Sequence, residues 1–329
     1  MRRRDFLVAS AATVGTLALS GCTETTSDST PAPPTFTTKL QKALIGRPSE
    51  ENFKKWRAAG FEGVEVYGGG SHLKSYDDAA RDRELAEKHG LVLHSVLFGW
   101  SELNSKEPSV IEACQAQIRR SIEAARGYGA SAVLLVPCQV PGMRVPKPWE
   151  WDIKFDEKTG MVTSVADGDN TKYAPYIEAQ NWATMSSGKA IEALIPDAEK
   201  AGVIIALENV WNNLWISPGL MKNFVASFAS PWVQAYFDVG NHVRYAKPTE
   251  YIETLGKLIK KVHIKDFKLD RKHRNGGKFV DLRDGSVDWP AVRKALDRID
   301  YNGFLTIEGS RGLSLAEKSK RLDLIIEGK

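Results

Sequence analysis

Short apolar segments alternate with amphipathic segments along most of the chain. The amphipathic stretches, such as residues 109–129 and 182–202, carry apolar residues at helical spacing and end in glycine just before the next apolar segment. The apolar segments are residues 42–46, 63–67, 91–98, 131–137, 203–208, 233–238, 261–266 and 303–308. Such alternation predicts parallel strands joined by helices, and eight strands are the number that closes a (β/α)₈ barrel.

The alternative arrangement of such units is an open, doubly wound parallel sheet. That fold normally carries a glycine-rich phosphate-binding turn after its first strand. The corresponding segment here, IGRPSEENF at residues 45–53, has no such turn. We therefore predict an α/β protein with a single (β/α)₈ TIM-barrel domain over residues 39–329, a length that is normal for this fold.

One connection is much longer than the others. Residues 138–175 follow the fourth predicted strand and contain Trp149 and Trp151. Within them, the sequence WDIKFDEKTGMVTSV (151–165) alternates around a polar turn and predicts a β-hairpin. A loop of this length is usually either functional or disordered. Because it leaves the C-terminal end of a strand, we expect an ordered excursion that covers the barrel mouth.

The segment KVHIKDF (261–267) combines a buried strand pattern with charged residues. On a strand, Val262 and Ile264 share one face, while His263 and Lys265 share the other. If the aliphatic face packs outward against helices, the opposite face points into the barrel. The barrel interior must therefore be polar at this level.

Polar residues also end the neighbouring strands. The ends of the last four predicted strands carry Glu208, Asp238, His263 and Glu308. The C-terminal strand ends form the active site of a TIM barrel, where isolated buried carboxylates are costly and repel one another. A divalent cation removes both costs; we expect Mn²⁺, and Mg²⁺, Co²⁺ or Zn²⁺ also suit this donor set. The alternative is that each residue forms an ordinary salt bridge, but four coincident strand ends favour a metal site.

Other residues are candidates for substrate contact. If side chains alternate regularly, Glu65 and His94 on the second and third strands also face the mouth. Lys265 either anchors a substrate oxygen or carboxylate, or pairs with a neighbouring carboxylate of the protein. Three tryptophans follow strand ends and either stack on a sugar or pack in the core: Trp100, Trp211 and Trp215.

Four short segments carry a resemblance to a known superfamily. ALENVW, FDVGNH, VHIKD and TIEGS contain the four strand-end residues. They resemble the xylose isomerase-like TIM-barrel superfamily, which includes sugar phosphate isomerases/epimerases, ketose 3-epimerases and inosose dehydratases, and the resemblance spans about residues 40–327. It implies that all four residues bind the metal. It also implies that Glu208 and Glu308 are the catalytic acid/base pair of an epimerase.

One histidine departs from the epimerase pattern. Those enzymes often carry a histidine three residues after the ligand aspartate, whereas here His242 lies four residues after Asp238. Asn241 occupies the position nearer to the usual one. We expect His242 to reach the substrate, but the departure leaves open whether the reaction is a plain ketose epimerisation.

These features predict a metal-dependent isomerase or epimerase acting on a sugar or keto-sugar. The reaction would remove a proton next to a carbonyl and pass through an enediolate. The alternative is a lyase or dehydratase that uses the same site on a 3-keto-glycoside or an inosose-type substrate. The complete four-residue set argues against a non-catalytic carbohydrate-binding lipoprotein. Too few histidines and a net charge of +4 without a long basic run argue against an endonuclease IV-like nuclease and a nucleic-acid partner.

The N-terminus predicts export. Residues 1–21 begin with arginines, including a twin-arginine-like Arg3-Arg4, and continue with a short apolar stretch typical of a signal peptide. Leu19-Ser20-Gly21-Cys22 resembles a bacterial lipobox, so we expect a lipidated Cys22, a flexible tether over residues 22–38 and a periplasmic or cell-surface lipoprotein. The alternative is an uncleaved membrane helix or an inert tail. The spacing of the remaining cysteines suggests neither zinc binding nor a disulfide framework.

Overall fold

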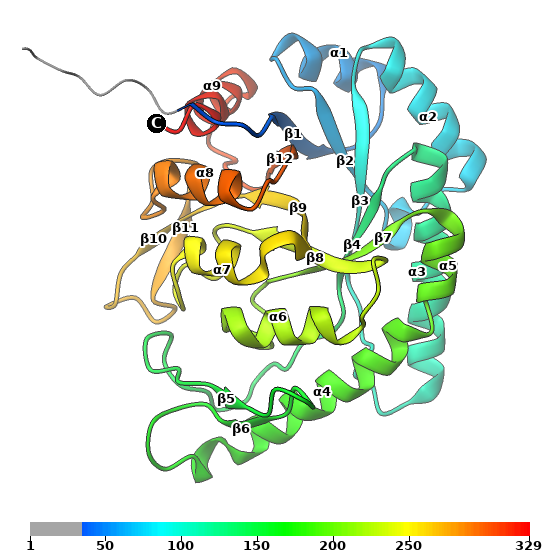
Figure 1. The fold of residues 1–329 in the computed structure, drawn as a ribbon. Helices are drawn as coiled ribbons and strands as arrows, with labels where there is room; N and C mark the ends of the chain where they lie inside the picture. Colours follow the sequence, from blue (N-terminus) through cyan, green and yellow to red (C-terminus); the bar gives the residue numbers. More distant parts are fainter. Residues whose placement is uncertain (1–34) are drawn as a thin grey trace, which may run out of the picture. The chain divides into compact units, whose positions relative to one another are not determined.

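The computed structural model describes residues 35–329, and the expected export signal and Cys22 lie outside them. Eight parallel strands close a barrel in the order β1-β12-β9-β8-β7-β4-β3-β2, which confirms the predicted TIM-barrel fold (Figure 1). The barrel strands are β1 Leu40–Gly46, β2 Gly63–Tyr67, β3 Val92–Trp100, β4 Ala132–Val136, β7 Ile204–Glu208, β8 Val233–Asp238, β9 Ile259–Ile264 and β12 Gly303–Ile307. Each coincides with one of the apolar segments of the sequence.

Helices pack around the outside of the barrel (Figure 1). The α-helices are α1 Glu50–Ala58, α2 Tyr76–Lys88, α3 Pro108–Tyr128, α4 Ala174–Glu192, α5 Ile195–Ala201, α6 Pro218–Ser227, α7 Pro248–Leu255, α8 Trp289–Arg298 and α9 Leu315–Ile326, with short 3₁₀ helices at Gly70–His72, Thr171–Tyr173 and Gly256–Leu258. Serine side chains cap the N-termini of α1, α2, α6 and α9 by accepting a backbone hydrogen bond. Gly129 and Gly202 end α3 and α5 in the left-handed conformation.

The main hydrophobic core lies between the strands and the helices. Val262 and Ile264 of β9 belong to it, so the aliphatic face of this strand packs outward as predicted. The barrel interior is divided. On the side of β4 and β7 it holds a small apolar cluster that includes Leu134 and Ala206. On the side of β2, β3, β9 and β12 it holds the buried polar residues Glu65, His94, Lys261, His263 and Thr306. One of these polar residues, His263, also belongs to the candidate functional site described below.

The excursion after β4 is ordered and contains the predicted hairpin. Its strands, β5 Lys154–Phe155 and β6 Val162–Ser164, are antiparallel. The hairpin packs beside α4 and α6 (Figure 1), where the side chain of Asn181 bonds the backbone N–H and C=O of Val162, and Asn223 donates to the carbonyl of Glu157. The hairpin therefore does not cover the barrel mouth. Other parts of the excursion reach the loops that follow β7 and β8: Cys138 and Val140 form hydrogen bonds with Asn212 and Asn213, and residues 145–151 line a pocket there.

A second hairpin was not predicted. Strands β10 Asp266–Leu269 and β11 Gly277–Val280 pair antiparallel directly after β9. The Asp266 carboxylate holds its base, since it accepts hydrogen bonds from the backbone N–H groups of Phe267, Arg283 and Gly285 and from the indole N–H of Trp289. Asp266 thus has a structural role at the start of this hairpin. Among residues 35–329, none of the helices combines the length and the apolar character that crossing a bilayer requires.

Candidate metal centre

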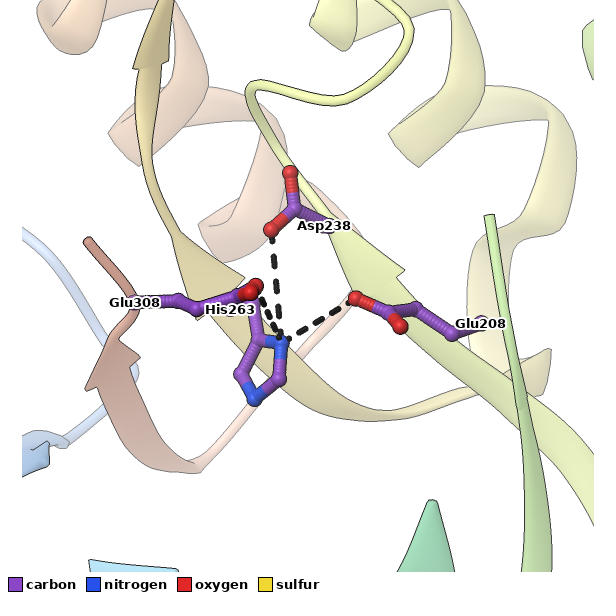
Figure 2. Close-up of side chains that lie close together, drawn as sticks. All are labelled: Glu208, Asp238, His263 and Glu308. Atoms are coloured by element: carbon purple, nitrogen blue, oxygen red, sulfur yellow. Dashed lines mark hydrogen bonds and ion pairs between the residues drawn. The ribbon is translucent and has the colours of Figure 1, made fainter. Parts of the chain in front are cut away.

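The four strand-end side chains lie together at the C-terminal end of the barrel. Their strands, β12, β9, β8 and β7, are consecutive neighbours in the closed sheet. One potential ligand atom from each side chain lies within 4.8 Å of the others, and Figure 2 shows all four pointing toward a common centre. We call Glu208, Asp238, His263 and Glu308 the strand-end cluster. The predicted convergence is observed, while the roles of the residues stay predictions.

The imidazole of His263 is the hub of the cluster. Its Nδ1 atom lies 3.2 Å from Glu208 Oε1, 3.2 Å from Glu308 Oε2 and 4.0 Å from Asp238 Oδ2 (Figure 2). Its Nε2 atom, on the opposite side of the ring, lies 2.5 Å from Glu65 Oε2. If Nε2 carries the proton donated to Glu65, the Nδ1 lone pair points at the centre of the cluster. A carboxylate behind a ligand histidine is the usual way proteins orient such a ring toward a metal.

Backbone groups orient Asp238. Its Oδ1 atom accepts hydrogen bonds from the N–H groups of Gly240 and Asn241, at 2.8 and 2.6 Å, in the turn that follows β8. Its Oδ2 atom is buried and accepts no hydrogen bond within the described chain. Glu308 Oε2 is likewise buried without a well-aligned hydrogen bond. The ammonium of Lys265 lies near both oxygens but is the positive charge of one lysine shared with three buried carboxylates, so these donors fit a further cation such as Mn²⁺, Mg²⁺, Co²⁺ or Zn²⁺.

The pKa values of the three carboxylates reflect burial and the uneven distribution of positive charge around them. Burial raises the pKa of Glu208, and it raises the pKa of Asp238 to about 7 with a further contribution from the neighbouring carboxylates. Burial opposes ionisation of Glu308 as well, but His263 and Lys265 outweigh it and hold the pKa of Glu308 well below its usual range. A divalent cation would favour the ionised form of all three carboxylates.

Lys265 lies beside the cluster and contacts two of its carboxylates. Its Nζ atom lies 2.8 Å from Glu308 Oε2 and 3.5 Å from Asp238 Oδ2, and it donates to Asn241 Oδ1 at 3.1 Å. Of the two roles open for Lys265 in the sequence, the salt bridge to a neighbouring carboxylate is therefore present. Lys265 also lines the adjacent cavity, so the expectation that it contacts substrate stays a prediction.

A cavity of about 590 Å³ opens beside the cluster. Glu308 and Lys265 contribute to its wall, and Glu308 is the cluster residue with the most exposed side chain, at 32%. The remaining wall includes the aliphatic and aromatic side chains of Leu44, Trp56, Tyr67 and Phe279. It also includes two basic residues, Arg311 and Lys318. A cavity of this size holds a drug-sized ligand.

Glu65 and His94 do not face the open mouth. Glu65 is completely buried behind His263, and His94 is 3% exposed. Lys261 donates to the carbonyl of His94 at 2.8 Å, and the ring of His94 bonds the Thr306 hydroxyl. The expected substrate contacts of Glu65 and His94 are therefore corrected: both side chains are enclosed within the barrel.

A β-bulge lies at His94 in β3. Leu93 pairs with Val64, but the next pair is Ser95 with Glu65, so His94 is an extra residue in β3. Leu93 packs in the outer core, whereas His94 and Ser95 both turn inward. His94 therefore points inward as alternation predicts, and the bulge turns Ser95 inward as well; what the prediction missed is that Lys261 and Thr306 enclose the His94 ring.

His242 also lies away from the cavity. It is 2% exposed, and its Nε2 atom bonds the carbonyl oxygen of Val210 at 3.0 Å. Tyr245 and Tyr251 pack against its ring, and burial lowers the pKa of His242 to about 4. In this structure His242 is enclosed by protein groups, and the expected contact with substrate stays a prediction.

The three candidate tryptophans have different surroundings. Trp215 is buried and stacks on Phe224 with ring centroids 4.0 Å apart, so it is a packing residue. Trp100 is half exposed. Trp211 donates its indole N–H to the carbonyl oxygen of Asn241 at 2.5 Å and packs against Phe279. Substrate binding by Trp211 stays a prediction.

Two asparagines bond the backbone and side chains of the cluster. Asn209 was not named from the sequence, and Asn241 was named only for its position near the usual histidine. Asn209 bonds both the N–H and the C=O of Asp238, at 2.7 and 2.8 Å, and so ties the end of β8 to that of β7. Asn241 donates to the carbonyl oxygen of Asn209 and lies 3.4 Å from Glu208 Oε1. Each asparagine lies within three residues of a cluster carboxylate in the sequence, a signal that could have identified both.

Comparison with known proteins gives a family match. A family model described as xylose isomerase-like TIM barrel matches residues 53–324. A comparison with curated proteins returned no match.

Several solved structures share the fold. A D-tagatose 3-epimerase-like protein is 20% identical, with 87% of this chain and 98% of that one covered and a TM-score of 0.64. The 3-keto-D-glucoside 4-epimerase from E. coli is 15% identical, with 88% and 98% covered and a TM-score of 0.58. The IOLI protein, solved with a zinc atom, is 16% identical, with 87% and 96% covered and a TM-score of 0.63.

Proposed function

The chain belongs to the xylose isomerase-like TIM-barrel family, and we propose that it is a divalent-metal-dependent isomerase or epimerase of a sugar or keto-sugar. The observation that carries this proposal is the strand-end cluster, in which three buried or partly buried carboxylates and one imidazole nitrogen converge at the barrel mouth. The names of solved structures with the same fold, a tagatose 3-epimerase-like protein and a 3-keto-glucoside 4-epimerase, support the same reaction class.

The metal would be held by all four residues of the strand-end cluster. We propose Mn²⁺, because three carboxylates with one imidazole form a hard donor set; Mg²⁺ and Co²⁺ suit it too, and the zinc atom of the IOLI protein makes Zn²⁺ the main competitor. A bound divalent cation polarises a sugar carbonyl and its neighbouring hydroxyl and lowers the energy of the enediolate.

Glu208 and Glu308 would carry the protons. In an epimerisation, one carboxylate removes the proton from the carbon next to the carbonyl, and a carboxylic acid returns a proton to the opposite face. Glu208 and Glu308 occupy the two ends of the row of four strands, β7 and β12, which suits them to opposite sides of a ligand. Lys265, 2.8 Å from Glu308, would keep that carboxylate ionised and ready to act as the base.

A lyase or dehydratase reaction is the second candidate, and the cavity favours it. The same deprotonation next to a ketone can break the bond to a β-oxygen substituent, which leaves with the electron pair and takes up a proton. Apolar groups such as Trp56, Tyr67 and Phe279 line the cavity beside Glu308. An apolar wall in a cavity of about 590 Å³ suits the aglycone of a 3-keto-glycoside.

Export completes the proposal. Residues 1–21 would direct the chain out of the cytoplasm, by the twin-arginine route, and Cys22 would carry a lipid that holds the barrel at a membrane surface through the tether of residues 22–38. The enzyme would then be a periplasmic or cell-surface lipoprotein. A substrate at that location would be an unphosphorylated carbohydrate more readily than a cytosolic sugar phosphate.

One experiment tests the proposed reaction. The purified protein is analysed for bound metal and then incubated in D₂O with a panel of ketoses and 3-keto-glycosides. We expect about one divalent cation per chain, in line with one cluster, and metal-dependent deuterium incorporation next to the carbonyl of at least one substrate. Release of an aglycone would select the lyase reaction. A protein that binds no divalent metal and exchanges no proton would refute both.

A further inference from the structure

A second pocket lies beyond Trp211, away from the strand-end cluster. Its volume is about 430 Å³. Residues 145–151 of the excursion, the loops after β7 and β8 and the tip of the β10–β11 hairpin form its walls. The side chains that carry the argument are Lys147, Trp151, Trp211, Arg244, Tyr245 and Arg274.

Arg244 lacks a counter-ion. Its guanidinium carbon lies 3.8 Å from the centre of the Trp211 ring and 4.6 Å from that of Tyr245. The Nη2 group donates to the Tyr245 hydroxyl, Nη1 lies 3.5 Å from the carbonyl oxygen of Asn275, and Nε is buried without a hydrogen-bond partner. No carboxylate of residues 35–329 lies within 4.0 Å of Arg244. A partly buried arginine normally has such a partner, because an unpaired buried charge is costly.

The surroundings of the pocket add positive charge. Arg274 and Lys147 also line it, while neither aspartate nor glutamate does among the described residues. Glu150 neutralises Lys147 from the edge, at 3.3 Å. Arg271 stands near the same rim, 6.0 Å from the ring of Trp149. The pocket is therefore a cationic site with aromatic walls, open to a ligand that supplies the missing negative charge.

We infer that this pocket binds the oxyanion group of a carbohydrate ligand. The guanidinium of Arg244 offers a planar fork that matches a carboxylate, sulfate or phosphate group, and Arg274 can approach the same group from the hairpin. Trp151 adds an apolar wall for the sugar that bears the group, while the Trp211 ring holds the guanidinium of Arg244 in place. The shared chemistry is an oxyanion on a sugar, which can come from a uronic acid or from a phosphate ester.

The pocket stands apart from the proposed reaction. Trp211 and Asn241 separate it from Glu208, since the indole N–H of Trp211 bonds Asn241, which in turn lies 3.4 Å from the Glu208 carboxylate. Anion binding should therefore persist in protein freed of metal. This separation allows the inference to be tested whether or not the proposed enzymatic activity is correct.

The test measures anion binding to the full-length, metal-free protein after the chelator has been removed. Sodium glucuronate, glucose 6-phosphate and sodium sulfate are titrated at constant ionic strength, with glucose as the neutral control, and the thermal midpoint and tryptophan fluorescence are recorded. We expect a saturable rise in the midpoint and a fluorescence change with at least one anion, and none with glucose. The anion that binds most tightly identifies the source of the oxyanion. Tightest binding of glucuronate indicates a uronic acid, and tightest binding of glucose 6-phosphate indicates a phosphate ester. Equal binding of all three anions indicates a site for a simple oxyanion.

Matched variants locate the site. Arg244→Gln and Arg274→Gln should each weaken binding by about ten- to a hundredfold, the effect of losing one charge-assisted hydrogen bond. Arg274 is exposed, so its variant tests the site even if Arg244→Gln disturbs folding. Arg120→Gln removes the same charge from the exposed face of α3 and should leave binding unchanged. The inference would be overturned if the anion stabilised all three variants as much as the wild type, or if no anion bound saturably to the wild type.

Discussion

The Nε2 atom of His263 lies 2.5 Å from Oε2 of Glu65, on the side of the ring that faces away from the other carboxylates of the cluster. This contact fixes the orientation of the ring. With Nε2 donating to Glu65, the other ring nitrogen, Nδ1, faces Glu208, Asp238 and Glu308, and its lone pair would be available to a metal bound among them. A carboxylate expected to touch substrate thus has a different task, that of positioning the ligand histidine.

Glu65→Gln tests this positioning role. The glutamine amide oxygen can still accept a hydrogen bond from His263, but it lacks the negative charge that makes the imidazole a stronger ligand for the metal. We expect the affinity for the metal to fall by about 10- to 100-fold, as for other partners of ligand histidines. Competition with a chromogenic chelator measures the affinity. Glu178→Gln on the exposed face of α4 is the control, and an unchanged affinity in Glu65→Gln would mean that the contact does not orient a ligand.

Asp238→Asn should abolish metal binding and at the same time raise the stability of the metal-free protein. The asparagine oxygen can keep the two backbone hydrogen bonds that Oδ1 accepts, while its NH₂ group replaces the unsatisfied Oδ2 and donates to the neighbouring carboxylates. Since a buried unsatisfied acceptor costs about 1–3 kcal/mol, the metal-free variant should be more stable than the metal-free wild type by up to that amount. Metal affinity should be lost at the same time.

Thermal unfolding with and without metal measures both effects. Wild-type protein should gain stability on metal addition, by an amount that grows with the metal concentration, whereas Asp238→Asn should not respond. Asp167→Asn, an exposed carboxylate in the excursion, controls for the loss of charge. If metal-free Asp238→Asn is less stable than the wild type, the cluster is an internally satisfied network and the metal assignment fails.

Cys22→Ala tests the export proposal. In a bacterial host that processes lipoproteins, the wild-type chain should partition into the membrane fraction, because acyl chains add about 0.8 kcal/mol of membrane affinity for each buried CH₂ group. The variant lacks the attachment point and should be recovered in the soluble fraction. Cys114→Ala removes a thiol from within α3 and should partition like the wild type. Membrane association of Cys22→Ala would show that another feature anchors the protein.

The strand ends were predictable because burial and periodicity act together there. Each of Glu208, Asp238 and His263 lies in an apolar segment that could only be a buried strand, so a polar residue at its end had to face a polar site. Parallel strands in a barrel bring such ends together irrespective of loop structure. The position of the cluster therefore followed from local pattern plus topology.

The residues whose surroundings were wrongly predicted are positioned by contacts that do not show in the hydrophobic periodicity of the sequence. His94 points inward as expected, but Lys261 of β9 and Thr306 of β12 enclose its ring, and such contacts between distant strands form only in the closed barrel. His242 is buried because the turn after Asp238 is held by Asn209 and Asn241, whose hydrogen bonds form only in the folded barrel. The β10–β11 hairpin was missed since the sequence between its strands is dominated by charge, and the Asp266 carboxylate that holds it reads as a surface residue.

Glu308→Gln and His263→Ala separate proton transfer from metal binding. A glutamine at position 308 keeps an oxygen donor for the metal but cannot accept a proton, so metal occupancy should fall modestly while exchange of the substrate proton with solvent drops by about 10²–10⁴-fold. His263→Ala removes the Nδ1 donor at the centre of the cluster and should weaken metal binding first, with activity partly restored by excess metal. The two variants differ because the imidazole has no proton-accepting role once both nitrogens are engaged, by Glu65 and by the cluster, whereas a carboxylate keeps a second oxygen. Deuterium wash-in at a series of metal concentrations distinguishes them, with Glu178→Gln as the unaffected control. If Glu308→Gln exchanged the substrate proton at the wild-type rate, the base would be Glu208, the remaining glutamate of the cluster.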